Sequence, residues 1–155
     1  MNVEFVNPFL SAMANVLTTM ADMKCSPGKA HLKKSTSAGG QVTGIMGMAG
    51  DQVKGSFAIS FSKPVILDIT KRMLGEAVTT IDATVIDMVG ELTNMATGGA
   101  KAKLTEIGYD FNMATPVVVS GELHTIDHAS TGPTIVVPFT TDAGDFFVEI
   151  NFSTV

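Results

Sequence analysis

The sequence predicts an α+β fold in which a mixed or antiparallel sheet packs against long helices. Three observations support this prediction. Apolar residues recur at helical spacing early in the chain. After residue 109, β-branched residues and segments in which apolar and polar residues alternate dominate, and turn-forming residues separate these segments. Helices followed by hairpin-connected strands are typical of a layered α+β architecture. With 155 residues, the chain is expected to form one domain over 1–155.

Composition excludes several classes of protein. Hydrophobic residues make up 45% of the chain and charged residues 16%, which favours a compact globule over disorder. A net charge of -5 disfavours binding to nucleic acid. No apolar run approaches the roughly 20 residues that cross a bilayer, and the first residues lack the features of a signal peptide. With a single cysteine, Cys25, no internal disulfide can form, so we expect a cytoplasmic protein that does not bind membranes.

The first helix is predicted to begin at Asn7 and Pro8, because asparagine caps free amides and proline is tolerated at the first helical position. It should end near Lys24, before a proline turn. Its apolar stripe comprises Phe9, Met13, Val16, Leu17 and Met20. Residues 29–40 read as an ordered loop, within which the segment KAHLKK could form a short edge strand protected by its lysines.

Residues 41–48 and 53–61 are predicted to form a hairpin that turns at 49–51. Phe57, Ile59 and Phe61 are apolar at alternating positions, and Ala58 between the first two is apolar as well. This pattern favours a strand that is buried on both faces.

Two helices follow the hairpin. Ser62 can cap a helix over 64–74, which Gly75 would end. The second begins near Asp82 and runs to about Glu106, which at 1.5 Å per residue is roughly 36 Å, enough to cross a small domain.

The last third of the chain reads as strands. Residues 115–126, 133–141 and 145–153 are rich in β-branched and aromatic side chains. Turn-forming residues separate the later segments at 130–132 and 142–144. We therefore expect an antiparallel meander of three strands.

The long helix carries two stripes of residues. The first is expected to pack on the sheet and comprises Val85, Met88, Leu92, Met95, Gly99 and Ala102. The second lies two positions later and comprises Asp87, Glu91, Asn94, Gly98 and Lys101. An offset of two residues turns the helix by about 200°, so the second stripe should face solvent. The glycine pair is costly in a helix and predicts that another element or a partner approaches that turn closely.

The spacing Glu-x-x-Asn is by itself a weak signal, since most such pairs are ordinary surface residues of a helix. Its context is more informative. The helix carries few other charges, yet Glu91 and Asn94 stand at its centre, with Asp87 one turn before them.

Asp87, Glu91, Asn94 and Pro116 follow one another at the spacing of a family signature, in which an Asp or Ser precedes Glu, then Asn, then a more distant Pro. On these residues the sequence resembles the CheC/CheX family of chemotaxis phosphatases, and CheX more than CheC. The expected order of elements also matches the family over nearly the whole chain. The resemblance therefore implies a CheC-like layered fold.

The resemblance implies a phosphatase that hydrolyses the aspartyl phosphate of a CheY-like response regulator without a covalent enzyme intermediate. Asn94 would orient the attacking water, and Glu91 would pair with a lysine of the regulator. Asp87, Gly98 and Lys101, on the same face, are expected to belong to the binding surface. The Mg²⁺ would lie in the regulator, so this chain is expected to bind no cofactor or metal.

A search for a second copy of the motif finds only Glu4 and Asn7, which lack the preceding Asp or Ser, and Asn7 reads as a helix cap. One site per chain is the CheX pattern. In that pattern two chains associate through their sheets, which implies a homodimer.

Other candidate sites are weaker. His124 and His128 would lie about 13 Å apart on one strand, too far to hold one ion, and read as surface or turn residues. His31 has no nearby residue of ligand type, and Cys25 has no histidine or cysteine beside it. The glycine-containing segments GDQVKGS and TGGAK lack the order of a phosphate loop.

Two alternatives remain open at the level of sequence. A non-catalytic adaptor of the same fold would bind a receiver domain or a flagellar switch component without dephosphorylating it. A purely structural dimer module would leave Glu91 and Asn94 as incidental surface residues. The sequence does not show which regulator would be the substrate, which pathway is served, or which strand forms the dimer.

Overall fold

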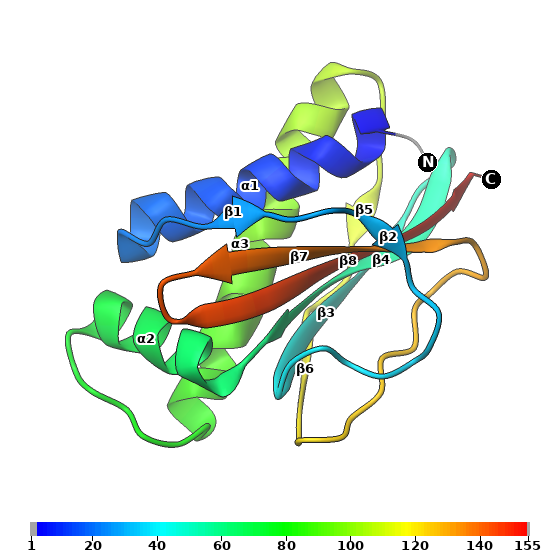
Figure 1. The fold of residues 1–155 in the computed structure, drawn as a ribbon. Coiled ribbons are helices and arrows are strands. Elements are labelled where there is room, and N and C mark those ends of the chain that lie inside the picture. The colour runs from blue at the N-terminus through cyan, green and yellow to red at the C-terminus, as the bar shows by residue number, and fades with distance from the viewer. Residues whose placement is uncertain (1–2, 155) are drawn as a thin grey trace.

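The computed structural model describes residues 3–154, in which three helices pack on a sheet of eight strands (Figure 1). The helices are α1 (Val3–Ala21), α2 (Lys63–Leu74) and α3 (Ala83–Glu106). The strands are β1 (Ser26–Pro27), β2 (His31–Leu32), β3 (Val42–Ala49), β4 (Val53–Phe61), β5 (Asn112–Met113), β6 (Val117–Ser120), β7 (Thr134–Thr141) and β8 (Gly144–Thr154). The predicted α+β class is confirmed.

The sheet has the order β1-β7-β8-β4-β3-β5, with β2 also paired to β7 and β6 to β3. Every pairing is antiparallel. The short edge strand expected within 29–34 is confirmed as β2, although β1 at the predicted proline turn extends the same edge.

The two faces of the sheet differ in chemistry, as β8 shows. Phe146, Val148 and Ile150 point to the helices and belong to the hydrophobic core. Phe147 and Glu149, on the alternate positions, point to the opposite face. Figure 1 shows α1 and α3 against the first face, and two long loops beside the strands on the other side.

α1 begins at Val3, so the predicted start at Asn7 and Pro8 is wrong. Pro8 lies inside the helix, where it lacks the N–H that would bond to the preceding turn. The additional turn buries Phe5 completely and brings its ring 4.6 Å from that of Phe152. Burial of an aromatic side chain stabilises by roughly 1.5–3 kcal/mol, which is comparable with the cost of an interior proline.

α1 also ends earlier than predicted, at Ala21 rather than near Lys24. Asp22 adopts a left-handed φ of 48°, and the N–H of Met23 donates to the carbonyl of Leu17 at 3.1 Å, which closes the helix end. The predicted stripe is buried at Phe9, Met13 and Leu17 and half-buried at Val16, whereas Met20 is 47% exposed.

The hairpin and the helix after it form as predicted. β3 and β4 pair from Val42 opposite Phe61 to Ala49 opposite Lys54, and β4 is buried on both faces. α2 ends at Gly75, whose φ of 76° is left-handed. Ser62 stands at the cap position but does not cap α2 through its side chain; its hydroxyl donates to the carbonyl of Asp145 at 2.7 Å.

The expected strand over 115–126 is wrong in length and in partner. Only Val117–Ser120 forms a strand, and it pairs with β3 rather than with β7. Residues 121–133 instead form a loop beside the outer face of the sheet, with an isolated bridge between Thr125 and Ser37. The meander is therefore reduced to the hairpin of β7 and β8.

α3 has the predicted bounds, but its buried face is rotated from the predicted one. The buried residues are Val85, Val89, Leu92, Thr93, Ala96, Thr97, Ala100 and Leu104. Met88 and Met95 are half-buried, and Gly99 and Ala102 are exposed. Two threonines are tolerated in the core because Thr93 donates its hydroxyl to Val89 O and Thr97 to Thr93 O.

Gly44 of β3 allows α3 to lie close to the sheet. A Cβ at Gly44 would overlap Thr93 Oγ1 and lie 3.1 Å from Val89 Cγ1. We expect Gly44→Ala to lower the free energy of unfolding by about 1–3 kcal/mol, because the close packing leaves no room for a methyl group. Urea unfolding measures this loss. The control is Gly47→Ala on the same strand, where the Cβ would have an ordinary contact at 3.7 Å and the change should stay within about 0.5 kcal/mol. Equal stability of both variants would contradict the packing argument.

Candidate functional site

α3 presents Asp87, Glu91 and Asn94 outward, as predicted. The carboxylate of Asp82 caps the helix by accepting from the N–H of Val85 at 3.1 Å. Asp87, Glu91 and Asn94 are exposed, while the opposite side of the helix is buried against the sheet and α1. The three side chains therefore share one solvent-facing surface of an element that is anchored along its length.

A groove of about 700 Å³ lies beside these residues, between α3 and the segment 113–118. Its lining comprises Ile86, Asp87, Gly90, Glu91, Asn94, Met113, Ala114, Thr115, Pro116 and Val118. The sheet fixes this second wall. Met113 pairs with Met48, the N–H of Ala114 donates to Gly47 O at 2.9 Å, and Val117 pairs with Ile45.

The structure brings all four residues of the sequence signature into one groove. Asp87, Glu91 and Asn94 come from α3, and Pro116 comes from the connection between β5 and β6. Two other predicted binding residues, Gly98 and Lys101, lie further along α3, beyond the groove lining. They are half-buried.

Sequence reasoning missed the rest of the lining. Ile86 and Gly90 precede Asn94 by eight and four residues, so helical periodicity alone could have placed them on the same side of α3. Val118 carried no such signal, because its position depends on the pairing of β6 with the distant strand β3.

The polar groups of the groove are available to a partner. Among residues 3–154, Asp87, Glu91 and Asn94 have no hydrogen bond or ion pair with another side chain. The two carboxylates give the groove a negative rim, and the carboxamide can both donate and accept. Such a site suits recognition of a cation and orientation of a small polar molecule.

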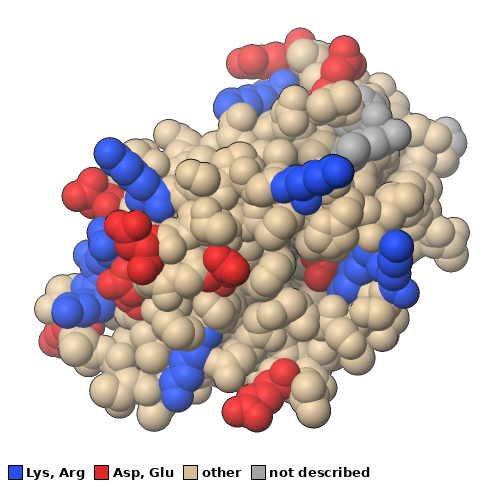
Figure 2. Space-filling model, viewed as in Figure 1, with Lys and Arg blue, Asp and Glu red and all other residues tan. Residues whose placement is uncertain are grey.

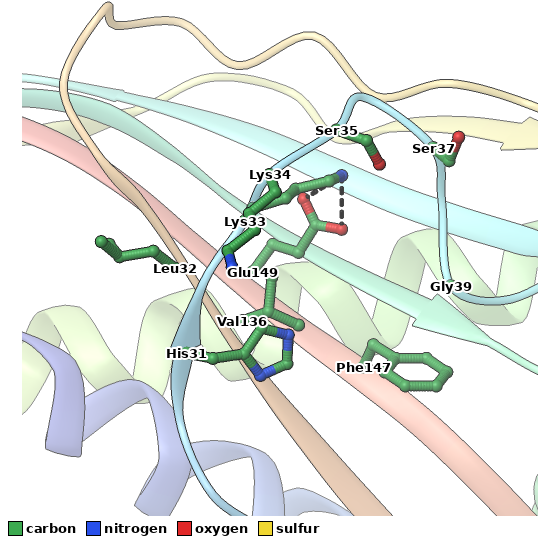
Figure 3. Close-up of a pocket in the computed structure, with 10 residues that line it drawn as sticks. All are labelled: His31, Leu32, Lys33, Lys34, Ser35, Ser37, Gly39, Val136, Phe147 and Glu149. Atoms are coloured by element: carbon green, nitrogen blue, oxygen red, sulfur yellow. Dashed lines mark hydrogen bonds and ion pairs between the residues drawn. The ribbon is translucent and has the colours of Figure 1, made fainter.

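A second pocket, of about 560 Å³, lies on the opposite face of the sheet (Figure 3). His31, Lys34 and Phe147 line it, and the Lys33–Glu149 ion pair forms part of its wall. Lys33 Nζ lies 2.8 Å from each carboxylate oxygen of Glu149. Because both charges are already paired, this wall leaves little binding capacity. The exposed serines of the lining, Ser35 and Ser37, form no hydrogen bond with His31 among the described residues.

The ion pair belongs to a buried polar network. His128 donates from Nε2 to Glu149 at 2.8 Å, and its Nδ1 lies 2.6 Å from the hydroxyl of Ser56. Burial opposes ionisation of Glu149, but hydrogen bonds from His128 and Lys33, with their positive charge, outweigh it and lower the pKa of the carboxyl group. This arrangement attaches two loops to the sheet, so we assign it a structural role.

The prediction that His124 and His128 lie on one strand is wrong, and of the two only His124 lies next to a turn. Both are half-buried and lie outside any strand. His124 Nδ1 donates to Gly121 O at 2.7 Å, and its Nε2 lies 2.6 Å from the Thr43 hydroxyl. Cys25 is half-buried, and burial raises the pKa of its thiol, which disfavours a reactive thiolate.

The charged side chains are scattered over the face shown in Figure 2, where no extended basic patch forms. Within the described part of the chain, no group of three His, Cys, Asp or Glu side chains could hold a metal ion. None of the helices in residues 3–154 combines the length and hydropathy needed to span a membrane.

Comparison with known proteins yields a consistent set of relatives. The family described as "Chemotaxis phosphatase CheX" matches residues 42–140. The CheY-P phosphatase CheX of Thermotoga maritima is 25% identical over 122 residues, which are 78% of each chain.

Solved structures share the fold over almost the whole chain. The crystal structure of chemotaxis protein CheX from Vibrio vulnificus has 51% identity and a TM-score of 0.91, covering 97% of this chain and 99% of that one. A CheX-CheY-BeF3-Mg²⁺ complex from Borrelia burgdorferi has 26% identity and a TM-score of 0.81, covering 96% and 97%.

Proposed function

The chain belongs to the CheX family of chemotaxis phosphatases, and on this premise we propose that it hydrolyses the aspartyl phosphate of a CheY-like response regulator. The observation that carries the proposal is the groove of α3, which gathers Asp87, Glu91, Asn94 and Pro116 and leaves the three polar side chains without a partner among residues 3–154. The Thermotoga relative named as a CheY-P phosphatase and the solved CheX-CheY complex support the choice of substrate.

Asn94 is the proposed catalytic residue. Its side-chain oxygen accepts a hydrogen bond from a water molecule, and its amide group can donate to a phosphoryl oxygen, so one side chain sets the direction of attack. The water oxygen bonds to phosphorus while the bond between phosphorus and the aspartyl oxygen breaks. The products are the free aspartate of the regulator and inorganic phosphate, which retains the protons of the water. No bond to this chain is formed.

Glu91 is proposed to dock the regulator. It lies one helical turn from Asn94, so a lysine ammonium that binds Glu91 would be held beside the reacting phosphoryl group. A charge-assisted hydrogen bond of this kind fixes the register of two surfaces. The Mg²⁺ that acyl phosphate chemistry uses belongs to the regulator in this proposal, and this chain supplies orientation and docking.

The remaining residues of the outward face are proposed to enlarge the contact surface. Asp87 lies on the rim of the groove, where its carboxylate can attract a second cation of the regulator. Gly98 and Lys101 continue the same face beyond the groove. We further propose that residues 1–155 act as one phosphatase domain, that two copies form a homodimer with one site each, and that the protein acts in the cytoplasm.

A panel of acyl-phosphorylated, Mg²⁺-loaded receiver domains tests this function. Release of inorganic phosphate is followed with and without the protein, and binding is measured in parallel. Accelerated release for at least one receiver supports a phosphatase. Binding without acceleration for every receiver would favour an adaptor, and absence of both would favour a structural module.

Replacement of Glu91 by glutamine separates docking from chemistry. The amide keeps the shape but loses the charge that would pair with lysine, so we expect the half-saturating concentration of regulator to rise about 10-fold or more, with a smaller effect on the maximal rate. Steady-state kinetics at two salt concentrations measures both. The matched control is Glu106→Gln, at the far end of α3, which should behave as wild type. An unchanged half-saturating concentration for Glu91→Gln would remove the docking role.

A further inference from the structure

At two glycines of α3, no close contact within the described structure requires the absence of a side chain. A Cβ at Gly90 would meet only Val118 Cγ2, at an ordinary 3.6 Å, and a Cβ at Gly98 would meet nothing within 4 Å. Gly99 differs, because its Cβ would lie 3.2 Å from Ala12 of α1 and the two helices approach each other there. Glycine is a poor helix former, so bare positions at Gly90 and Gly98 weaken α3 without improving its packing.

These two positions flank Asn94 symmetrically. Gly90 precedes Asn94 by four residues and Gly98 follows it by four, so all three lie along one line of the helix. Each glycine is about 6 Å from Asn94 along the helix axis. Gly90 also lines the groove, next to the carboxylates of Asp87 and Glu91. The line of α3 that carries Asn94 is therefore without a side chain one turn before and one turn after it, while Glu91 stands beside this line.

This arrangement matters because the asparagine side chain is short. Its amide group is attached directly to Cβ, so it reaches a reacting group only if the surrounding surface lies almost against the helix backbone. A side chain at position 90 or 98, directly before or after Asn94 on this line, would meet the partner first. The rim of the groove adds two carboxylates that form no ion pair within the described part of the chain, and these complement a cationic surface and not a second acidic one.

We propose that Gly90 and Gly98 are positioning residues, whose missing side chains let the surface around the regulator's aspartyl phosphate lie against α3 on both sides of Asn94. This inference rests on the proposed function and specifies how the regulator approaches. It also separates the glycine pair by role: Gly99 serves the packing of α1 on α3, and Gly98 serves the partner.

The test is a size series at each glycine. Gly90→Ala, Gly90→Leu, Gly98→Ala and Gly98→Leu all introduce better helix formers, so the melting temperature should stay the same or rise. We expect kcat/KM for the phosphorylated regulator to fall about 10-fold with alanine, and further with leucine, with the affinity for the BeF3-loaded regulator falling in parallel. A decrease in activity that accompanies unchanged or higher stability cannot come from a damaged fold.

Ala102→Leu is the matched control for added bulk. Ala102 is exposed on α3 and lies about twice as far from Asn94 as Gly98 does, about 12 Å along the axis and about 80° around it, so this variant should keep wild-type kinetics. Wild-type affinity and rate in the glycine variants would overturn the inference and leave the proposed function intact. If wild type binds a receiver without dephosphorylating it, the activity is refuted while the affinities still decide the role of the glycines. If wild type neither binds nor dephosphorylates any receiver, both proposals are refuted.

Discussion

Replacing Asn94 by alanine should lower the rate of regulator dephosphorylation by about 100-fold or more, while most of the affinity for the regulator remains. The expected loss is large because orientation of the attacking water is the main contribution that this chain can make, and a small misplacement of reacting groups already costs about 100-fold. Single-turnover release of phosphate at saturating protein measures the chemical step directly. Asn94 is exposed and has no partner within residues 3–154, so the fold should be unaffected.

Asn94→Asp refines this prediction. The carboxylate has nearly the same shape and can still accept a hydrogen bond from water, but it cannot donate one and it repels the phosphoryl oxygens. We therefore expect a loss similar to that of alanine, together with weaker binding of the phosphorylated regulator. If either variant kept the wild-type rate, Asn94 would have no part in the reaction.

Replacing Glu149 by glutamine should lower the free energy of unfolding by about 3 kcal/mol. The side chain of Glu149 is 2% exposed and that of Lys33 10%, so the variant leaves a buried ammonium group without its counter-charge. Thermal and urea unfolding measure the effect. Glu122→Gln, in an exposed part of the 121–133 loop, is the control and should change stability by less than about 0.5 kcal/mol.

A double variant distinguishes the ion pair from simple packing. Lys33→Met with Glu149→Leu removes both charges and keeps most of the volume, so much of the lost stability should return. Stability that falls further in the double variant would show that the network contributes through its hydrogen bonds to His128 and not through charge pairing.

The dependence of stability on pH follows from the same carboxyl group. The pKa of Glu149 in the folded protein is lowered, since hydrogen bonds and the charges of Lys33 and His128 outweigh burial. Its contribution is therefore complete above the ordinary carboxyl pKa and is lost as the pH falls through the lower, folded-state value. The difference in stability between wild type and Glu149→Gln should shrink in that acidic range. A difference that stays constant down to the lowest pH would contradict this linkage.

Much of the site could be predicted because its main features are local. α3 was predicted within one residue from its cap and its length, and helical periodicity placed Asp87, Glu91 and Asn94 on one exposed face. The rotation of the buried face was missed because Thr93 and Thr97 read as polar. In the structure their hydroxyls bond to the preceding turn, which satisfies them inside the core.

Features that depend on distant pairing could not be predicted in the same way. The segment after Tyr109 has strong β propensity, but propensity does not identify the neighbouring strand, and β6 pairs with β3 across about 75 residues of sequence. The residues of the second wall of the groove, apart from Pro116, were therefore not predicted. The network of Lys33, His128 and Glu149 was missed for the same reason, because its members come from three separate segments.

The anchoring of α3 has a consequence for the kinetics of association. Its backbone is ordered by the Asp82 cap and by a buried face before any partner arrives, so complex formation restricts mainly the rotamers of a few exposed side chains. The loss of conformational entropy on binding should therefore be small for this chain. The two proteins can then associate without a slow ordering step in this chain. The association rate constant should therefore depend on ionic strength more than on the rate of any conformational rearrangement.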